Sequence, residues 1–408
     1  MKCRHCGAGL DLPLINLDSA PPSNAYLTEQ TLKMPEKWYP LRVLVCQECW
    51  LAQTEDYAGA DELFNEEYAY FSSFSQTWLQ HAERYVQDMV ERFELGPTSF
   101  VVEVAANDGY LLQYVKAQGI NSLGIEPTAS TARAAREKGL EIKEAFFGAQ
   151  LGKQLAVEGK QADLTAANNV LAHVPDINDF VSGFAHLLKP QGVSTFEFPH
   201  LLQLIQQSQF DTIYHEHFSY LSLTAVQRIF EANGLSVFDV EEIPTHGGSL
   251  RVYAQRKDVG QHACTPKVAQ VLQLESDAGI RQASFYHGLQ ENARRIKHDL
   301  LSFLLKARQE GKSVIAYGAA AKGNTLLNYA GVREDLLPSV VDRNPNKQNK
   351  YLPGSRIPIV AEQAIRDGRP DYVLILPWNL REEVLRQLSY IKEWGGQFVT
   401  AVPELEVL

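Results

Sequence analysis

Two Cys-x-x-Cys pairs near the N-terminus constrain this chain more than any other feature of its sequence. Cys3 and Cys6 form the first pair, and Cys46 and Cys49 form the second. Each pair can place two thiolates on one side of a tetrahedral ion, and a chain reversal between the pairs completes the tetrahedron. The sequence therefore predicts a Zn²⁺ site, the alternative being four buried thiols without a metal. Because sulfur fills all four positions, we expect the zinc to be structural rather than catalytic.

The composition is that of a globular protein larger than one ordinary core. Its 408 residues favour two or three domains. The net charge of −11 argues against nucleic acid or an anionic membrane as a partner, because both attract a positive surface. No run approaches the roughly 20 apolar residues of a membrane span, and the start lacks a signal-peptide pattern. We expect a cytoplasmic protein, by default a monomer, in which the lone Cys264 is a small buried side chain.

Residues 100–258 alternate short apolar runs with amphipathic stretches. The predicted strands are Phe100–Val104, Ser122–Ile125, Asp163–Ala167 and Gly192–Phe198, and the predicted helices include Thr128–Lys138 and Asp179–Leu188. This alternation predicts an α/β fold, a doubly wound parallel sheet with helices on both faces. A later strand is expected at Ser249–Ala254, and an earlier one at Tyr39–Val45.

A second alternating series follows long predicted helices over residues 265–310. Its predicted strands are Ser313–Tyr317, Ser339–Asp342, Tyr372–Leu376 and Gln397–Ala401. We therefore expect three domains: a zinc-binding domain over residues 1–75, a central domain over 76–258, and a helical connector with a second Rossmann-like lobe over 259–408.

A ligand site is predicted where the strand at 100–104 enters a tight loop. In doubly wound sheets, ligands bind just beyond the carboxyl ends of such strands. Only Gly109 remains of the Gly-x-Gly-x-x-Gly pattern, so the loop suits a nucleoside better than a pyrophosphate. Glu126 ends the next strand, where an acid accepts hydrogen bonds from ribose hydroxyls; the alternative is that it only caps a helix. Together they fit S-adenosylmethionine, with predicted contacts at Glu103, Ala105, Asn107, Asp108, Gly109, Tyr110, Glu126 and Asn169.

The densest group of proton-transfer side chains is Tyr214-His215-Glu216-His217-Phe218-Ser219-Tyr220. It could be a metal site, a polar loop that caps the next helix at Thr224, or a general base with its partners. We favour a base, because a histidine near a carboxylate and tyrosine hydroxyls suits proton transfer near neutral pH. Glu216 and His217 would face opposite ways in a strand, so both can line a site only within a turn. His173, after another predicted strand, is either structural or part of the same site.

The second lobe carries a strand, a small-residue loop and a helix start at residues 314–325. It is not a P-loop, because Asn324 stands where the lysine is required. The loop from Gly318 lets backbone N–H groups approach a phosphate, and Lys322 adds charge. Asp342 ends the next strand, and Pro377-Trp378-Asn379 follows the third. We expect Gly318, Lys322, Asn324 and Asp342 to bind a second ligand, unless the small residues serve only close packing.

Taken together, these motifs resemble the bacterial sugar-nucleotide C-methyltransferases, and most of all those that methylate C-3′ of dTDP-linked 4-keto-deoxysugars. The resemblance covers essentially the whole chain. It is carried by the two cysteine pairs and by residues 67–73, 107–110, 124–127, 169–174, 214–218, 247–251 and 318–324.

The resemblance implies a class I methyltransferase fold for the central domain, with S-adenosylmethionine bound there and the nucleotide sugar between it and the C-terminal lobe. It implies that the histidine matching His217 removes a proton next to the ketone, giving an enolate that attacks the methyl group. The residues matching Tyr68, Tyr214, Glu216 and His173 surround the sugar. The zinc domain is then expected to bring Tyr68 to this site.

Two other classes of function stay open at this point. One is an NAD-dependent sugar-nucleotide oxidoreductase or epimerase, although neither glycine loop carries the full dinucleotide pattern. The other is a non-enzymatic zinc-knuckle binding protein, against which the acidic charge and the proton-transfer cluster argue.

Overall fold

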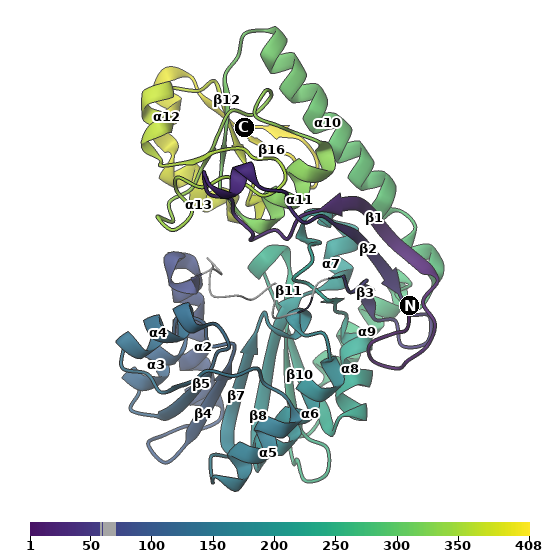
Figure 1. Ribbon diagram of the computed structural model, residues 1–408. Coiled ribbons are helices and arrows are strands. Elements are labelled where there is room, and N and C mark those ends of the chain that lie inside the picture. The colour runs from purple at the N-terminus through teal and green to yellow at the C-terminus, as the bar shows by residue number, and fades with distance from the viewer. Residues whose placement is uncertain (58, 60–70) are drawn as a thin grey trace.

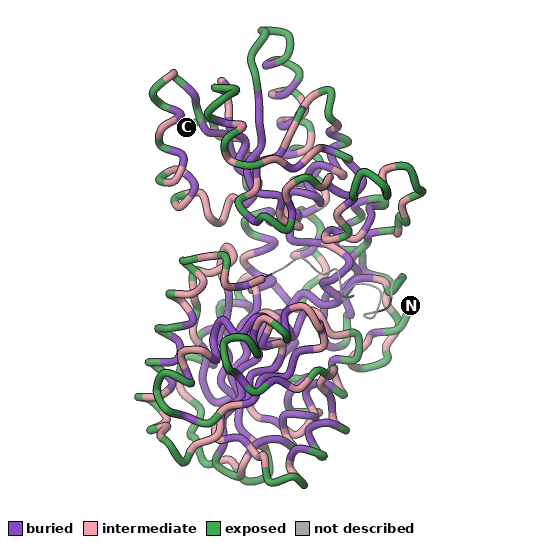
Figure 2. Tube along the Cα trace, turned by 60° about the vertical axis from the view of Figure 1, so that its left-hand side comes forward, coloured by how far each residue is buried: buried purple, intermediate pink, exposed green. Residues whose placement is uncertain are grey.

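Three β-sheets organise the computed structural model, which describes residues 1–57, 59 and 71–408. Figure 1 shows the two larger sheets in separate lobes, with the N-terminal strands beside the junction between them. The chain is buried mainly along the strands of the central lobe and in the interior of the C-terminal lobe (Figure 2).

The central lobe contains a seven-stranded sheet in the order β10-β11-β8-β7-β4-β5-β6. Strands β6, β5, β4, β7 and β8 run parallel, and β11 runs antiparallel between β8 and β10. Their bounds are β4 (Phe100–Val104), β5 (Asn121–Ile125), β6 (Ile142–Lys143), β7 (Ala162–Asn168), β8 (Leu188–Pro199), β10 (Leu235–Ile243) and β11 (Ser249–Arg256). The predicted doubly wound sheet is confirmed, with one antiparallel strand added near its edge.

Alternation along β4 decides which helices cover each face of this sheet. Val102 and Val104 pack with α5, α6, α8 and α9, whereas Val101 packs with α2, α3 and α4. The helices are α2 (Gln76–Arg92), α3 (Leu112–Ala117), α4 (Ala129–Glu137), α5 (Ala149–Val157), α6 (Ile177–Leu187), α7 (Leu201–Gln206), α8 (Leu223–Ala232) and α9 (Pro266–Ala278). Helices on both faces leave the carboxyl ends of the parallel strands open to a ligand.

The C-terminal lobe repeats this architecture with a six-stranded sheet in the order β14-β13-β12-β15-β16-β17. The strand order reverses between β12 and β15, so a crevice is expected beyond their carboxyl ends. The strands are β12 (Val314–Tyr317), β13 (Val340–Val341), β14 (Ile359–Val360), β15 (Tyr372–Ile375), β16 (Gln397–Thr400) and β17 (Glu406–Val407). The helices are α10 (Leu289–Gln309), α11 (Ala321–Ala330), α12 (Gln363–Gly368) and α13 (Arg381–Gln387).

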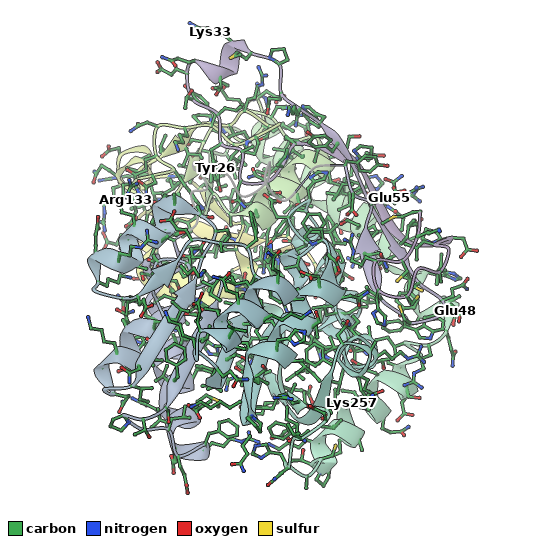
Figure 3. The ribbon with its side chains drawn as sticks, turned by 60° about the horizontal axis from the view of Figure 1, so that its bottom comes forward. Tyr26, Lys33, Glu48, Glu55, Arg133 and Lys257 are labelled. Atoms are coloured by element: carbon green, nitrogen blue, oxygen red, sulfur yellow. The ribbon has the colours of Figure 1, made fainter. Side chains whose placement is uncertain are left out.

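The N-terminal module is a small antiparallel sheet that contacts both lobes. It consists of β1 (Leu12–Ala20), β2 (Tyr39–Val45), β3 (Ala52–Thr54) and β9 (Ser219–Tyr220), which comes from the central part of the chain. Apolar side chains of β1 pack with α10 and α11, while the cysteines pack with the central lobe. Tyr26, labelled in Figure 3, adds a polar contact with the C-terminal lobe, because its hydroxyl donates to Ala319 O (2.6 Å).

Two local predictions were wrong. Cys264 is exposed, because it lies in the connection between β11 and α9 rather than inside an element. Thr224 does not cap α8; the Ser222 hydroxyl accepts from Ala225 N (3.1 Å) instead. Among the residues that the structure describes, no helix has both the length and the apolar character needed to cross a bilayer.

Candidate functional site

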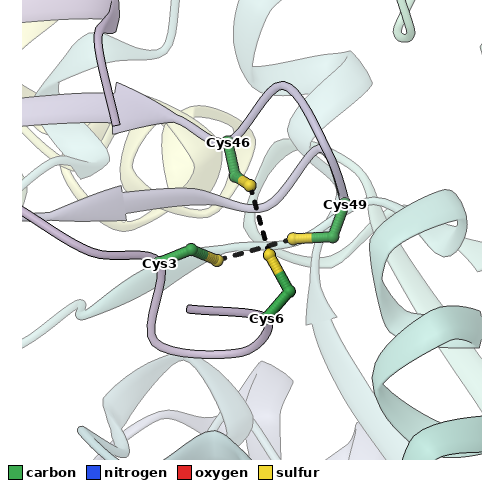
Figure 4. Close-up of side chains that lie close together, drawn as sticks. All are labelled: Cys3, Cys6, Cys46 and Cys49. Atoms are coloured by element: carbon green, nitrogen blue, oxygen red, sulfur yellow. Dashed lines mark hydrogen bonds between the residues drawn. The ribbon is translucent and has the colours of Figure 1, made fainter. Parts of the chain in front are cut away.

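The four N-terminal cysteines converge on one point (Figure 4). Their Sγ atoms all lie within 4.8 Å of one another, and the pairs Cys3–Cys49 and Cys6–Cys46 are each 3.5 Å apart. A disulfide would be about 2.05 Å long. A tetrahedron with Zn–S bonds of about 2.3 Å has edges of roughly 3.8 Å. The geometry therefore fits Zn²⁺ held by all four thiolates, as predicted.

A short series of contacts connects this cluster to the loop that carries His217. Gln53 Nε2 donates to Cys3 Sγ (3.3 Å), and Gln53 Oε1 accepts from Arg4 N (2.9 Å). The Arg4 guanidinium donates to Thr54 O (3.1 Å), and the Thr54 hydroxyl donates to His217 O (3.1 Å). Strand β3 also pairs directly with β9, which follows this loop. The N-terminal module thus helps to hold the loop that carries His217 in place.

A cavity of about 370 Å³ lies between the central and C-terminal lobes. Its wall begins at the carboxyl ends of β4, β5 and β7 and continues to the first turn of α11 and the loop after β15. This is the edge at which doubly wound sheets bind ligands. The volume falls within the roughly 300–1,000 Å³ of small-molecule sites.

One end of the cavity contains five of the predicted cofactor residues. They are Ala105, Asn107, Tyr110, Glu126 and Asn169. Glu126 accepts two backbone hydrogen bonds, from Asn107 N and Thr128 N (2.9 Å each), and burial raises the pKa of its carboxyl. Glu126 thus holds the loop before α4 without capping the helix, because it bonds the N–H of Thr128 rather than one in the first turn, and it lines the cavity.

The other three predicted cofactor residues lie behind the loop rather than in the cavity wall. Glu103 is 1% exposed, and burial raises the pKa of its carboxyl well above the usual value. Asp108 faces Lys138, with Nζ and Oδ2 3.6 Å apart. Gly109 has φ +76°, and a Cβ there would collide with Leu140. These residues hold the shape of the loop.

Aromatic side chains that the sequence did not assign to the site complete this end. They are Trp78, Phe146, Phe147 and Phe180. Trp78 stacks on Tyr110, with ring centroids 5.8 Å apart. The two neighbouring phenylalanines follow β6, so they lie at the same sheet edge as the predicted contacts. That position in the βαβ series was the signal that could have found them.

His217 and His173 meet in the middle of the cavity wall, with ring centroids 4.6 Å apart. His217 Nδ1 lies 2.9 Å from Thr212 O. Because a carbonyl only accepts, this contact assigns the hydrogen to Nδ1 and leaves Nε2 with a lone pair. Burial and the charge of His173 lower the pKa of His217 well below its usual value, and burial lowers the pKa of His173 to about 4. Both rings are therefore neutral at neutral pH.

Tyr214 and Glu216 both belong to the turn expected around His217, but only Tyr214 lines the cavity. The turn is present, because His217 N donates to Tyr214 O (3.0 Å). The Tyr214 ring lines the cavity, and its centroid lies 4.0 Å from that of the His217 ring. Glu216 does not line the cavity; its Oε1 accepts from both the backbone N and Nδ2 of Asn24 (3.2 Å each), and Asn24 is the residue in the wall. Tyr68, the remaining predicted catalytic residue, lies outside the described residues.

The C-terminal lobe contributes two lysines to the wall. Lys322 Nζ donates to Asn379 Oδ1 (2.9 Å) and lies 4.4 Å from the centroid of the Trp378 ring. Burial lowers the pKa of Lys322 to about 8. Lys347, which the sequence did not single out, donates to Ala319 O (2.8 Å). This side of the cavity is therefore suited to an anion.

Gly318 and Asn324, both predicted to bind substrate, instead shape the loop behind Lys322. Gly318 has φ +92°, and a Cβ there would press on the ring of Pro377. Asn324 Nδ2 donates to Ser23 O (2.6 Å). Neither residue lines the cavity.

Asp342 likewise supports the loop from behind. Its two carboxylate oxygens accept from Ala319 N and Asn344 N (2.8 Å each). Tyr26 occupies the other side of Ala319, where its hydroxyl meets the carbonyl. The crevice at the strand reversal is thus partly filled by the N-terminal module.

His246 is a further wall residue that the sequence did not assign. It adopts φ 54°, its ring centroid is 5.3 Å from that of Trp78, and burial lowers its pKa to about 3. A left-handed non-glycine residue costs about 1–3 kcal/mol, and such strain concentrates at functional sites. The sequence signal was the His246-Gly247-Gly248 run just before the predicted strand at Ser249–Ala254.

Models of three protein families match the chain in order. They are described as "Putative zinc binding domain" over residues 3–64, "Methyltransferase domain" over 78–240 and "C-methyltransferase C-terminal domain" over 244–403. The C-methyltransferase NovU of Streptomyces niveus is 34% identical over 407 residues, covering 100% of this chain and 96% of the relative.

Solved structures also match part of the chain. Magnesium protoporphyrin IX methyltransferase from Synechocystis PCC 6803 with bound S-adenosylmethionine is 17% identical, covering 44% of this chain and 79% of that chain, with a TM-score of 0.34. An S-adenosylmethionine-dependent methyltransferase from Mesorhizobium loti is 14% identical, covering 44% of this chain and 100% of that chain, with a TM-score of 0.35.

Proposed function

The chain belongs to the S-adenosylmethionine-dependent C-methyltransferases, and we propose that it methylates the carbon next to the ketone of a nucleotide-linked 4-keto-deoxysugar. The expected position is C-3′ and the expected nucleotide is dTDP, in the synthesis of a branched-chain deoxysugar. The observation that carries the proposal is one cavity that combines a nucleoside end, a neutral histidine base and a lysine-lined wall.

Transfer to carbon requires a carbon nucleophile, and here a base must create it. His217 is suited to this role because Thr212 O fixes its hydrogen on Nδ1, and no described residue donates a hydrogen bond to Nε2. Burial keeps the ring unprotonated at neutral pH. The negative charge that develops on the substrate then stabilises the imidazolium as it forms.

Donors around the ketone must stabilise the enolate, since a C–H bond next to a ketone is a very weak acid. Tyr214 and His173, on either side of His217, are within reach of a sugar in the cavity. Tyr68 is the third proposed donor. Glu216 acts indirectly in this proposal, because it holds Asn24 in the wall.

The nucleoside end is proposed to hold the methyl donor. Glu126 would accept the ribose hydroxyls with the lone pairs that its backbone partners leave, while Asn107, Asn169 and Tyr110 surround the remainder. The sulfonium group supplies a methyl that is already activated for transfer. The chain's task is alignment with the carbanion and exclusion of water.

The C-terminal wall is proposed to hold the diphosphate of the sugar nucleotide. Lys322, Lys347 and the first turn of α11 bring positive charge and backbone N–H groups to the same side. Among the residues predicted for this role, Gly318, Asn324 and Asp342 would act by shaping the loop.

The proposed reaction has two steps. The C–H bond next to the ketone breaks, its proton moves to His217 Nε2, and its electron pair moves into the enolate. The carbon then bonds to the methyl group as the sulfur–methyl bond breaks, giving the methylated sugar and S-adenosylhomocysteine. His217 afterwards returns its proton to solvent.

The oxidoreductase and binding-protein alternatives have less support. Asp342, at the position where an acid would bind the ribose of NAD, does not line the cavity, whereas Glu126 does. Tyr26 occupies the neighbouring part of that crevice. A zinc-knuckle binding protein would have no need of a buried neutral histidine beside a nucleoside-sized cavity.

A methyl-transfer assay tests the proposal. The protein is supplied with S-adenosylmethionine labelled in the methyl group and with dTDP-, GDP- or CDP-linked 4-keto-deoxysugars, and carbon NMR locates the label. We expect a new C–CH₃ bond next to the ketone, at C-3′. Label on oxygen or no transfer to any sugar would refute the proposal, and tight NADH binding without S-adenosylmethionine binding would favour the oxidoreductase.

A further inference from the structure

The carbonyl that orients His217 belongs to a short segment that the C-terminal lobe holds in place. The segment is η4 (Phe210–Thr212) with Ile213. Asp211 is fully buried, and its Oδ2 accepts from Trp378 Nε1 (2.8 Å). The Thr325 hydroxyl donates to Ile213 O (2.9 Å). Residues on both sides of Thr212 are therefore attached to the other lobe.

The same tryptophan also contacts the proposed anion wall. The Lys322 ammonium lies over its ring at 4.4 Å from the centroid, and Lys322 hydrogen bonds to Asn379. A Cβ on Gly247 would collide with Cη2 and Cζ3 of Trp378, so the glycine leaves room for the indole ring. Trp378 thus lies between the lysine that would meet the diphosphate and the segment that orients the base.

The charges of Asp211 and Lys322 are coupled across this contact. Burial raises the pKa of Asp211 to about 6, and Lys322 opposes that rise. Burial lowers the pKa of Lys322 to about 8, and Asp211 opposes that fall. An anion bound at Lys322 would therefore change the electrostatic potential at the Asp211 carboxylate.

We propose that Asp211 is a positioning residue, which together with Trp378 couples occupation of the C-terminal wall to the orientation of His217. A diphosphate bound at Lys322 keeps Trp378 against Asp211. Asp211 then keeps Thr212 O in line with His217 Nδ1, so the lone pair of Nε2 faces the sugar. The inference rests on the proposed function for the identity of the anion and of the reaction.

Trp378→Phe tests this coupling, because it removes the indole N–H and keeps an aromatic ring near Lys322. We expect the exchange of the sugar's acidic proton with deuterated water to slow by roughly 10- to 100-fold. The KM for the nucleotide sugar should change by less than about threefold, since phosphate contacts remain. Asp211→Asn, whose amide oxygen can still accept from Trp378, should lose less activity than Asp211→Ala.

Thr77→Val is the matched control. It removes another hydrogen bond between the lobes, from the Thr77 hydroxyl to Glu383 Oε2 (2.5 Å), without contact to the segment 210–213. We expect unchanged exchange in this variant. An equal loss in Thr77→Val, or a rise in KM alone in Trp378→Phe, would overturn the proposal.

A readout on the protein itself separates this inference from the proposed function. Nitrogen NMR of labelled histidine, with His217→Asn for assignment, reports which ring nitrogen carries the hydrogen. In the wild-type chain with dTDP, one neutral tautomer with hydrogen on Nδ1 is expected, and Trp378→Phe should show a mixture. The same single tautomer in Trp378→Phe would overturn the coupling even if methyl transfer to the sugar is confirmed.

Discussion

Thr54→Val removes one hydrogen bond between the N-terminal module and the loop that carries His217. The other contacts between these two segments stay intact. The Thr54 hydroxyl donates to His217 O (3.1 Å), and its side chain is buried. No other described group donates to this carbonyl. A buried acceptor left without a donor costs about 1–3 kcal/mol. Thr54 N still donates to Phe218 O (3.2 Å), so the strands remain paired.

We expect the free energy of unfolding to fall by about 1–2 kcal/mol. If the loss of this bond also shifts His217 away from the sugar, proton exchange at the sugar carbon should slow by roughly 3- to 30-fold, since about 1.4 kcal/mol corresponds to a factor of ten. Chemical denaturation measures the first effect, and deuterium incorporation followed by NMR measures the second. Zinc content should stay the same, because no ligand changes.

Thr165→Val provides the comparison. It removes a buried hydroxyl contact of similar kind, Thr165 Oγ1 to Ser194 Oγ (2.5 Å), in the middle of the central sheet. We expect a similar loss of stability with exchange within about twofold of the wild type, because distant sites act independently. Two results would show that the N-terminal module does not position His217. Thr54→Val could destabilise the chain without slowing proton exchange, or Thr165→Val could slow proton exchange equally.

Three further predictions concern the metal, the cofactor and the pH. Removing zinc with a chelator, or Cys46→Ser, should unfold the knuckles and expose the amides of β3 and β9 to hydrogen exchange, and protection that persists in both strands would contradict this. Glu126→Gln should weaken S-adenosylmethionine binding about tenfold or more in calorimetry, whereas the exposed Glu141→Gln should not. The pKa values of His217, His173 and His246 are all lowered in the fold, so the unfolded chain binds more protons as the pH falls below about 6.5. The contribution of these histidines to stability is therefore full above that pH and is lost below it, while the raised carboxyl pKa values of Glu103, Glu126 and Asp211 oppose the loss. NMR titration of the histidine rings isolates the effect, and a His217 ring that is protonated at about pH 6.5 would contradict the assignment.

Local patterns predicted much of this architecture. The cysteine spacing predicted the metal cluster, and apolar runs bounded by turn residues predicted β4, β7, β12 and β15. These features depend on residues close together in the chain. Strand β1 was missed because Pro13 lies within it, and proline argues against a paired strand.

Long-range contacts set the limits of prediction for the site. Nothing near Ser219 and Tyr220 indicates that they pair with β3, some 165 residues earlier in the chain. The direction of Glu216 depends on Asn24, and the pairing of Asp211 depends on Trp378. Such partners meet only when the N-terminal module and the two lobes pack together, so a sequence pattern cannot assign them.

Proton abstraction by His217 is the central claim, and one variant tests it most directly. The wild-type chain and His217→Asn are each incubated with a 4-keto nucleotide sugar in deuterated water, with and without S-adenosylmethionine. We expect the wild type to incorporate deuterium next to the ketone and to transfer the methyl group, and His217→Asn to do neither while still binding S-adenosylmethionine. Deuterium incorporation at the wild-type rate in His217→Asn would contradict the account and move the base elsewhere, with His173 next to be tested.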